Sequence, residues 1–489
     1  MTSVREISVA IEDLAETVKA QMSLGFGIGC MYVTEQSDLI KRSLEMIMAS
    51  NDDVLRITAP LSDDAYAALT PEFPSANVYE REIWEMSNVF PIGHHDMRPL
   101  KIRNVREGIY PMQKAADTSK VSYRVHIPGN DVIGKGVFEI PVGPIHAGVI
   151  EPGHFRFSVA GEPILMLRTY MGYKYRGIEK MMETPVVKDN TRLMERVSGD
   201  NAIAHSLAYL QAMERDTEIP VRAQYVRTIY AELERIYYML NGISGIALDT
   251  ALSVPASKGY MLKERILRLN HKVSGHRMLW GTLRPGGLRK DLTDESAKEI
   301  EKEVVRLKFD VDELFDIMTS SPSFMDRVES TGTVTKDEAV LMRAVGPIAR
   351  ASGIDYDVRK HHPYAAYGMI GMRTSTHTSG DVFARLYVKK KEISESVSII
   401  TQCINNMGRG DILTKVKMPE GFSMGMTESP RGEIMHCMHV VNGEIWRYKI
   451  RDASFPNWPV IELAVVGDIV PDFPLINKSF DLSYSGNDL

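Results

Sequence analysis

Residues 195–205 read ERVSGDNAIAH, and they lie just inside the part of the chain, from Thr191 onward, where the pattern turns helical. Good helix formers follow in residues 223–239. Residues 296–318 then carry apolar side chains at four-three-four-three-four spacing, which predicts a long amphipathic helix with one buried face. That stripe consists of Ile300, Val304, Leu307, Val311, Leu314 and Met318. The pattern favours a mostly helical bundle with small β elements at its edges.

The part of the chain before residue 191 has a different pattern. Residues 39–48 predict a short helix, and residues 54–58 predict a strand. A further strand running into a turn is expected over residues 137–144. Residues 154–159 and 164–167, separated by Gly-Glu-Pro, predict a hairpin. The fold class expected from these patterns is α+β.

Length and composition are those of a globular protein. The chain has 489 residues, which suggests two or three domains, and 44% are hydrophobic and 25% charged. The net charge of −6 gives no support for nucleic-acid binding, which needs a basic face. No apolar run approaches 20 residues and the N-terminus lacks a signal-peptide pattern, so we expect neither a transmembrane helix nor secretion.

The three cysteines, Cys30, Cys403 and Cys437, are scattered along the chain. They form no pair with the spacing of a metal site or of a disulfide framework. This usage favours a reducing, cytoplasmic setting. We therefore expect any role at a membrane to come through partner subunits.

Several motifs after residue 125 resemble one protein family. They are similar to motifs of the family that joins the complex I 49-kDa subunit to the large subunits of group 4 membrane-bound nickel–iron hydrogenases. In the motif YRGIEK, Tyr175 stands where the family has histidine. The matching segments are GPIH (143–146), EPGHFR (151–156), YRGIEK (175–180), RPGG (284–287), GDVFAR (380–385) and ESPRGE (428–433).

The first part of the chain resembles a second subunit type. Residues 79–86 (YEREIWEM) and 93–100 (GHHDMRPL) are similar to the signature of the complex I 30-kDa subunit. Fusion of the two modules is typical of formate hydrogenlyase and hydrogenase-4 large subunits. The resemblance implies a 30-kDa-subunit-like α/β domain over residues 1–125. It also implies a mostly helical 49-kDa or hydrogenase-like domain with peripheral β elements over residues 126–489.

Two segments match the metal-binding motifs of the hydrogenases, which look like E-R-I-C-G-x-C-x-x-A-H and D-P-C-x-x-C. They are residues 195–205 and residues 479–489 (SFDLSYSGNDL). The four thiolate positions become Ser198, Asn201, Ser483 and Gly486. Soft thiolates select nickel and low-valent iron, whereas hydroxyls, an amide and a glycine do not. The resemblance therefore implies a hydrogenase-shaped protein that binds no metal. The chain also stops at Leu489, without the further tail that such hydrogenases often carry.

Glu151 and His154 are candidate catalytic residues in the EPGHFR segment. The resemblance implies a proton-passing role for Glu151, and a structural acid bonded to backbone amides is the alternative. In quinone-reducing relatives a histidine of the matching loop points at the quinone headgroup. Here Pro152 stands at that place and His154 lies two residues later, while Gly199 aligns with the expected quinone tyrosine. These departures argue against a quinone site of the complex I type.

Arg431, in the ESPRGE segment, is the third candidate. In hydrogenases this segment surrounds the diatomic ligands of the iron, but here we expect Arg431 to neutralise a buried acid, Asp200 or Asp481. Other acids in or near the motifs are expected either to lead protons toward a membrane arm or to form salt bridges. They are Glu179, Glu232, Glu234 and Asp381. For His361, His362 and His377, solvated or hydrogen-bonded side chains are expected rather than a metal site.

The function implied is that of a peripheral-arm subunit in a membrane-bound oxidoreductase complex. Such a complex transfers electrons, to a quinone or another acceptor, and couples this to ion translocation. No cofactor is expected on this chain, and the iron–sulfur cluster belongs to a small subunit bound against the face of Ser198 and Ser483. Antiporter-like membrane subunits are the other expected partners, which places the chain on the cytoplasmic side of the cell membrane. Two alternatives stay open, a non-catalytic scaffold subunit and an active hydrogenase, although the latter needs thiolates that the sequence lacks.

Overall fold

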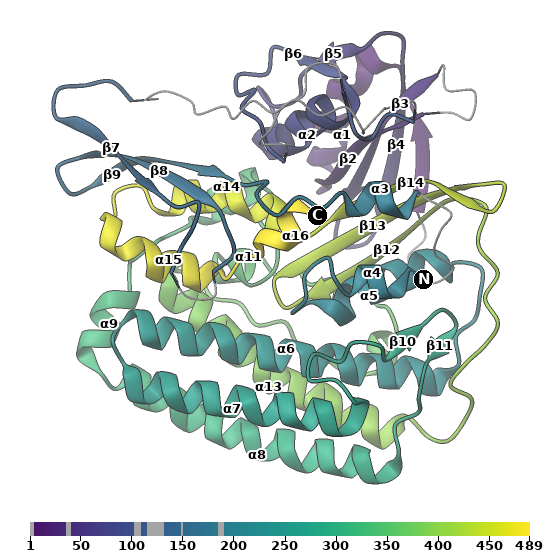
Figure 1. Ribbon diagram of the computed structural model, residues 1–489, viewed down its shortest axis with the longest axis vertical. Helices are drawn as coiled ribbons and strands as arrows, with labels where there is room; N and C mark the ends of the chain where they lie inside the picture. Colours follow the sequence, from purple (N-terminus) through teal and green to yellow (C-terminus); the bar gives the residue numbers. More distant parts are fainter. Residues whose placement is uncertain (1–3, 36–40, 102–108, 115–131, 148–149, 184–189) are drawn as a thin grey trace.

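A computed structural model describes residues 4–35, 41–101, 109–114, 132–147, 150–183 and 190–489 (Figure 1). The first module is built on a four-stranded sheet of order β1-β4-β3-β2, in which only the β1–β4 pair is parallel. Apolar side chains of two helices pack against this sheet. The elements are β1 (Val4–Ser8), α1 (Leu14–Ser23), β2 (Gly27–Glu35), β3 (Arg42–Ala49), β4 (Val54–Leu61) and α2 (Asn77–Ser87).

The helix predicted over residues 39–48 is wrong, because the described part of that segment is the strand β3. This strand lies inside the sheet, between β4 and β2, and seven of its eight residues are buried. A strand covered on both faces shows a continuous apolar run instead of alternation, and such a run cannot be told from a buried helix by periodicity. The strand predicted at residues 54–58 is confirmed within β4.

A second, antiparallel sheet carries the predicted hairpin. It consists of β7 (Val137–Val142), β8 (His154–Ala160) and β9 (Ile164–Tyr170), paired in that order. His154 lies opposite Tyr170 in this register. Both the hairpin and the strand before it are therefore confirmed. The predicted domain boundary near residue 125 lies outside the described residues.

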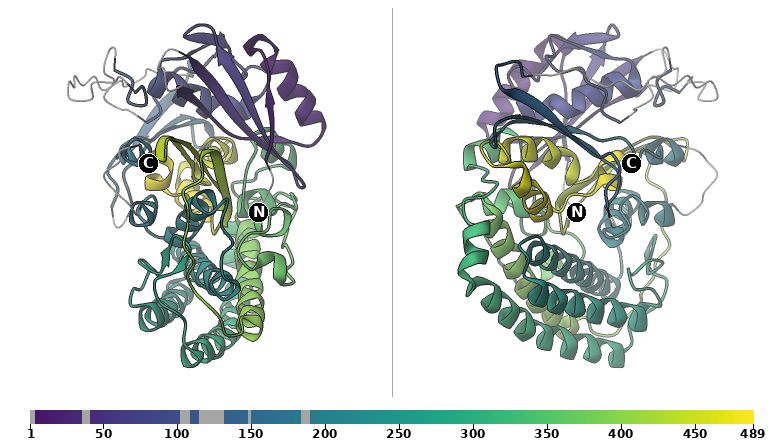
Figure 2. Two further views of the ribbon diagram at one scale, coloured as in Figure 1. Left: turned by 90° about the vertical axis from the view of Figure 1, so that its right-hand side faces the viewer. Right: turned by 60° about the vertical axis from the view of Figure 1, so that its left-hand side comes forward.

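Four long helices form the bundle: α6 (Val221–Asp249), α7 (Ser253–Ser274), α8 (Asp294–Thr319) and α13 (Val382–Asn406). All six residues of the predicted stripe are buried in α8, so the amphipathic helix is confirmed. Thr293 begins this helix with its side chain accepting a hydrogen bond from the Ser296 amide. The bundle lies at the end of the molecule opposite the first module (Figures 1 and 2).

A third sheet lies between the first module and the bundle (Figure 2). Its strands β12 (Gly421–Ser429), β13 (Gly432–Val441) and β14 (Glu444–Arg451) are antiparallel. β13 and β14 contact the first module directly: the Tyr32 hydroxyl lies 2.8 Å from Nε2 of His439, and the Arg451 Nε donates to the Gly29 carbonyl at 2.8 Å. The sheet thus joins the two modules through buried polar contacts.

The remaining elements are shorter. Among the described residues, no helix is long and apolar enough to cross a membrane. The other helices are α3 (Ile178–Met182), α4 (Thr191–Met194), α5 (Ala202–Met213), α9 (Pro322–Val328), α10 (Lys336–Leu341), α11 (Pro347–Ala351), α12 (Val358–His361), α14 (Ser454–Ala464), α15 (Phe473–Phe480) and α16 (Tyr484–Asp488). The 3₁₀ turns are η1 (Ile11–Asp13), η2 (Pro74–Ala76), η3 (Tyr367–Met369) and η4 (Val470–Asp472), and the short strands are β5 (Ala65–Ala67), β6 (Phe90–Ile92), β10 (Leu283–Arg284) and β11 (Gly287–Leu288).

Candidate functional site

The turn before α5 and the start of α16 meet in the interior, although 285 residues separate them. The hydroxyl oxygens of Ser198 and Ser483 lie 2.8 Å apart, and both residues are buried. Ser483 also caps α16, because its hydroxyl oxygen accepts a hydrogen bond from the Gly486 amide at 2.9 Å. Two of the four thiolate positions are therefore a pair of hydrogen-bonded hydroxyls.

Arg431 and Asp200 complete what we call the serine site, defined by Ser198, Asp200, Arg431 and Ser483. The Arg431 guanidinium donates to both carboxylate oxygens of Asp200, at 2.9 and 2.8 Å, and its Nε donates to the Asp481 carbonyl at 2.8 Å. The Ser198 hydroxyl donates to Asp200 at 2.8 Å. Burial alone would raise the pKa of Asp200, but Arg431 and the Ser198 hydroxyl lower it. Arg431 is thus paired with an acid of the site, as the sequence suggested.

The other two thiolate positions are occupied differently. Asn201 is fully buried, and neither polar atom of its side chain has a hydrogen-bond partner within the described residues. Gly486 lies so close to Asp452 that a Cβ added there would be 2.7 Å from the Asp452 carboxyl carbon. Position 486 therefore has no room for a cysteine side chain in this arrangement.

These residues do not fit a nickel–iron centre. The hydroxyls are hard donors already engaged in hydrogen bonds, and a guanidinium lies within the site. Nothing at these four positions supplies the charge or softness of a thiolate set. Among the residues that the structure describes, no group of three or more His, Cys, Asp or Glu side chains is placed to hold a metal ion.

Glu151 reaches the same neighbourhood from the segment before β8. Its Oε2 accepts a hydrogen bond from the Ser485 amide at 2.9 Å, two residues after Ser483. The side chain is 38% exposed, and Lys174 lies 3.9 Å away. Glu151 therefore connects the surface with the segment that carries Ser483, a position that suits either proton exchange or a structural role.

His154 lies at the start of β8, with its ring 5.8 Å from the ring of Tyr170. The neighbouring Gly153 packs against Tyr484, since an added Cβ would lie 2.5 Å from that ring. The structure therefore places the His154 ring against β9, while the segment just before it packs on α16.

Among the other motif acids, Glu234 holds the start of α5, the helix that follows Ser198 and Asp200. Its two carboxylate oxygens accept hydrogen bonds from the amides of Ile203 and Ala204, at 2.7 and 3.0 Å. Burial raises the pKa of Glu234 to about 8, although these two amide hydrogen bonds act in the opposite direction. Glu234 is therefore a buried acid that holds a proton near neutral pH.

Two further motif acids have structural partners. Glu179 accepts a hydrogen bond from the Ile450 amide at 2.9 Å, and Lys449 lies 3.0 Å away. Asp381 caps α13 through the Ala384 amide. Of the two readings that the sequence left open for these acids, their contacts favour the structural one.

The three histidines singled out in the sequence are engaged by nearby protein groups. His362 lies 2.8 Å from the Ser50 carbonyl. The ring of His361 stacks on Tyr356, and the ring of His377 lies 5.3 Å from that of Tyr387. Their side chains thus take part in local hydrogen bonding and ring packing.

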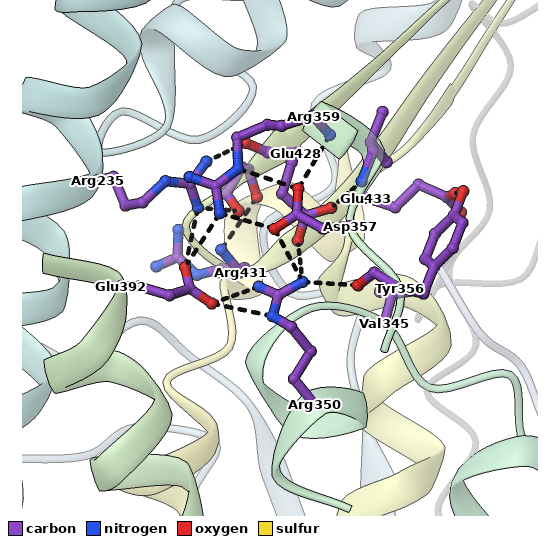
Figure 3. A network of polar contacts seen from close by, with 12 residues as sticks. Arg235, Val345, Arg350, Tyr356, Asp357, Arg359, Glu392, Glu428, Arg431 and Glu433 are labelled. Carbon is purple, nitrogen blue, oxygen red and sulfur yellow. Dashed lines mark hydrogen bonds and ion pairs between the residues drawn. The ribbon is translucent and has the colours of Figure 1, made fainter. Parts of the chain in front are cut away.

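Of a cluster of buried charges (Figure 3), sequence reasoning singled out only Glu232 and missed the cluster as a whole. Arg350 contacts Glu392 at 3.0 and 2.5 Å and Glu428 at 2.8 Å, and Arg359 contacts Asp357 at 2.7 Å. Arg235 donates to Glu392 at 3.3 Å. We call this set the charge cluster. Its members are Glu232, Arg235, Arg350, Asp357, Arg359, Glu392 and Glu428, and all are buried.

A partial signal for the charge cluster exists in the sequence. Arg350 lies between two alanines in a short apolar helix, and Arg235 and Glu232 lie in a helix whose other residues are mostly apolar. Charged side chains in such surroundings indicate buried pairing. The partners themselves come from distant parts of the chain, so the sequence does not identify them.

Comparison with known proteins defines the class to which this fold and site belong. Residues 8–122 match the family model "Respiratory-chain NADH dehydrogenase, 30 Kd subunit". Residues 249–418 and 412–488 match "Respiratory-chain NADH dehydrogenase, 49 Kd subunit". The chain is thus a fusion of two modules of the complex I type, as the motifs indicated.

Full-length relatives agree with the two matches. Formate hydrogenlyase subunit 5 of Escherichia coli is 30% identical over 89% of this chain and 79% of the relative. Hydrogenase-4 component G of the same organism is 33% identical over 86% and 76%, respectively. The C/D subunit of NADH-quinone oxidoreductase from Phocaeicola vulgatus is 31% identical over 84% and 86%. The chain therefore belongs to the family of complex I 30-kDa/49-kDa subunits and related hydrogenase large subunits.

Proposed function

We propose that this protein is a peripheral-arm subunit of a membrane-bound complex related to complex I and hydrogenase-4, and that it works without a nickel–iron centre. The complex transfers electrons to a quinone or another acceptor and couples this to ion translocation. The observation that carries the proposal is the hydrogen-bonded pair of Ser198 and Ser483, held by the Arg431–Asp200 ion pair, at the positions of the thiolates. The family supplies the architecture, and the donor set argues against hydrogen chemistry.

Elemental analysis, infrared spectroscopy and hydrogen assays of the purified chain test whether it lacks a nickel–iron centre. We expect no stoichiometric nickel, no infrared bands of iron-bound carbonyl or cyanide, and no hydrogen uptake or evolution. A large subunit that retains the four cysteines, produced in the same host with the same maturation proteins, is the positive control. One equivalent of tightly held nickel in this chain would overturn the proposal and favour the alternative of an active hydrogenase.

The partners belong to the same proposal. An iron–sulfur small subunit would bind against the face that carries Ser198 and Ser483, and antiporter-like membrane subunits would hold the pair at the cytoplasmic side of the membrane. The names of the relatives, which are subunits and components of larger enzymes, support this. Co-expression with the small subunit should raise the yield of soluble protein and give a stable pair on size exclusion. A monodisperse monomer that does not bind the small subunit would contradict membership in such a complex.

A non-catalytic scaffold subunit is the alternative within the same complex. The replacement of all four thiolates favours the scaffold, whereas the placement of Glu151 and Arg431 around Ser198 and Ser483 favours a working site. Reconstituted membranes distinguish the two. In the scaffold case, substitutions in the serine site that leave assembly intact will leave electron transfer intact as well. In the catalytic case they will slow it.

A further inference from the structure

A cavity of about 600 Å³ lies at the junction of the first module with β9, α14 and α16. The first module contributes residues of α2 and of the segment after β6 to its lining. The volume is typical of pockets that bind small molecules, and such pockets often lie where two domains meet. We call it the junction cavity. None of the four residues that define the serine site lines it, and its charged lining residues are Arg81, Asp96, Arg98, Arg168 and Glu462.

Two arginines of the first module share one close carboxylate in this lining. Nε and Nη2 of Arg98 donate to the two carboxylate oxygens of Asp96, at 2.8 and 2.7 Å. Arg81, whose side chain is 7% exposed, donates to three neutral oxygens and lies 3.6 Å from Asp96. Burial lowers the pKa of Arg81 to about 10, although the nearby carboxylates act in the opposite direction. Because Asp96 already binds Arg98 bidentately, the charge of Arg81 is only partly balanced.

The second module adds a third arginine and a second carboxylate. Arg168 lies 3.8 Å from Glu462, whose Oε1 accepts hydrogen bonds from the amide and the hydroxyl of Thr169, both at 2.7 Å. Burial alone would lower the pKa of Arg98, but its ion pair and the charge of Glu462 raise it, so Glu462 lies close to arginines of both modules. With His95 neutral, the lining holds three guanidiniums and two carboxylates, which leaves one positive charge.

Most of the uncharged lining is apolar. Phe455 and Trp458 of α14 are 4% and 2% exposed, and Leu100 and Met171 also line the cavity. Aromatic and thioether surfaces pack favourably against a flat ring. An occupant that suits both parts of the lining therefore carries one negative charge on an aromatic ring system.

We propose that the junction cavity binds a small aromatic monoanion, with its carboxylate or sulfonate group at the arginines and its ring against Phe455 and Trp458. Charge-assisted hydrogen bonds from guanidinium groups hold such an acid group. Because both modules line the cavity, the bound anion stabilises their association. Asn487 of α16 lines the cavity as well, which brings the ligand next to the helix that Ser483 caps. The site is independent of the proposed function.

Isothermal titration calorimetry on the full chain tests the proposal with naphthalene-2-sulfonate, and 2-naphthylmethanol is the uncharged counterpart. We expect one sulfonate per chain and an affinity at least about tenfold higher than that of the alcohol, because hydrogen bonds between charged groups are the stronger ones. Equal affinities, or no binding of the sulfonate at millimolar concentration, would overturn the proposal.

Charge variants decide whether the sulfonate binds at these arginines. Arg81→Gln should lower its affinity about tenfold or more, and Asp96→Asn should raise it about threefold, since a competing carboxylate is lost. Arg168→Gln should lower it about fivefold, and because that side chain is 32% exposed, this variant decides the matter if Arg81→Gln does not fold. Arg268→Gln, on an exposed side chain of α7, is the matched control and should bind as the native protein does. Native affinity in Arg168→Gln, or no gain in Asp96→Asn, would refute an anion site in this cavity.

Indole nitrogen NMR on the chain labelled with ¹⁵N-tryptophan locates the ring of the ligand. The indole resonance of Trp458, assigned by its loss in Trp458→Phe, should shift on saturation with the sulfonate. The resonances of Trp280 and Trp446, which lie outside the cavity lining, should stay in place. An unchanged Trp458 resonance would put the ring elsewhere and contradict the proposal.

Discussion

The serine site and the charge cluster are both buried and polar, yet they are built from different chemistry. The serine site holds one ion pair and two neutral hydroxyls, and the Asp200 side chain is 38% exposed. The charge cluster contains four carboxylates and three guanidiniums, all buried, from α6, α11, α12, α13 and β12 (Figure 3). The serine site is nearly neutral, and Asp200 exposes part of it to solvent. The other is densely charged and sealed.

The two regions also differ in how many structural elements they hold together. The charge cluster ties five elements together around β12, so its loss would affect the whole second module. The serine site lies at the ends of α5 and α16, where the exchange of side chains disturbs fewer partners. Adjacent residues on α6 contact the two regions, since Glu234 bonds the start of α5 and Arg235 enters the cluster. The two regions therefore depend on different contacts, although adjacent residues of one helix hold both of them.

The largest expected effect is on the charge cluster. Arg350→Met removes the guanidinium paired with Glu428 and leaves Glu392 with Arg235 and the more distant Arg359, which should lower the free energy of unfolding by about 3–5 kcal/mol. Arg268→Met removes an exposed i,i+4 pair with Glu264 and should cost less than about 0.5 kcal/mol. Thermal unfolding of the two variants measures the contrast. Similar midpoints would show that the cluster does not stabilise the module.

The next effect depends on pH and concerns Glu234. The folded protein keeps its proton up to a pKa of about 8, whereas the unfolded chain loses it near 4.5, so the unfolded state binds fewer protons between these values. The contribution of Glu234 to the free energy of unfolding therefore falls by on the order of 3 kcal/mol as pH rises from about 5 to about 8. Glu234→Gln should remove that fall.

Urea unfolding at pH 5 and pH 8 measures this effect as the difference between variant and native chain. Other titrating groups cancel in that difference. Glu444→Gln, an exposed acid at the start of β14, is the control and should leave the pH dependence unchanged. If the free energy of unfolding changes equally with pH in Glu234→Gln and in the native chain, Glu234 is ionised in the folded protein and acts only as a cap of α5.

The sequence predicted those parts of the molecule that have a one-sided pattern. The α8 stripe and the β8–β9 hairpin each have one apolar face, and both are confirmed. Residues 42–49 are buried on both faces, so their continuous apolar run suited a helix as well as a strand, and the helix prediction was wrong. Local pattern therefore predicts elements that have one exposed face, whereas a short and fully buried segment suits a helix as well as a strand.

The candidate site was predicted unevenly for a related reason. Aligned motifs pointed to Ser198, Ser483 and Arg431, because the resemblance supplies positions that the residue types alone do not. For the charge cluster, the motifs included Glu428 and drew attention to Glu232 but did not identify their partners. Three of its long-range pairs are 42, 78 and 127 residues apart, and a single sequence contains no information on which distant charges meet. The composition gives the number of charged residues in the chain, but which of them pair in the interior follows only from the fold.

A smaller effect is expected in the serine site. Arg431→Gln breaks the bidentate contact with Asp200 and should lower the free energy of unfolding by about 1–2 kcal/mol, since Asp200 is partly exposed to water. The double variant Arg431→Gln/Asp200→Asn removes both charges and should regain part of that loss. A double-mutant cycle with chemical denaturation measures the coupling. A loss as large as that of Arg350→Met would erase the distinction between the two regions.

The smallest effect on stability is expected for Glu151→Gln. The glutamine carbonyl can accept the Ser485 amide as Oε2 of Glu151 does, and the side chain is 38% exposed, so stability should change by less than about 0.5 kcal/mol. The variant cannot exchange a proton at that position, so turnover or ion translocation of the complex should fall if Glu151 passes protons. Thermal unfolding measures the stability, and coupled activity in membranes measures proton transfer. Glu462→Gln is the structural control, because native Glu462 accepts a hydrogen bond from the Thr169 amide in β9. Native activity in Glu151→Gln would assign Glu151 to the structural role of holding α16, and with it favour the scaffold subunit over the catalytic one.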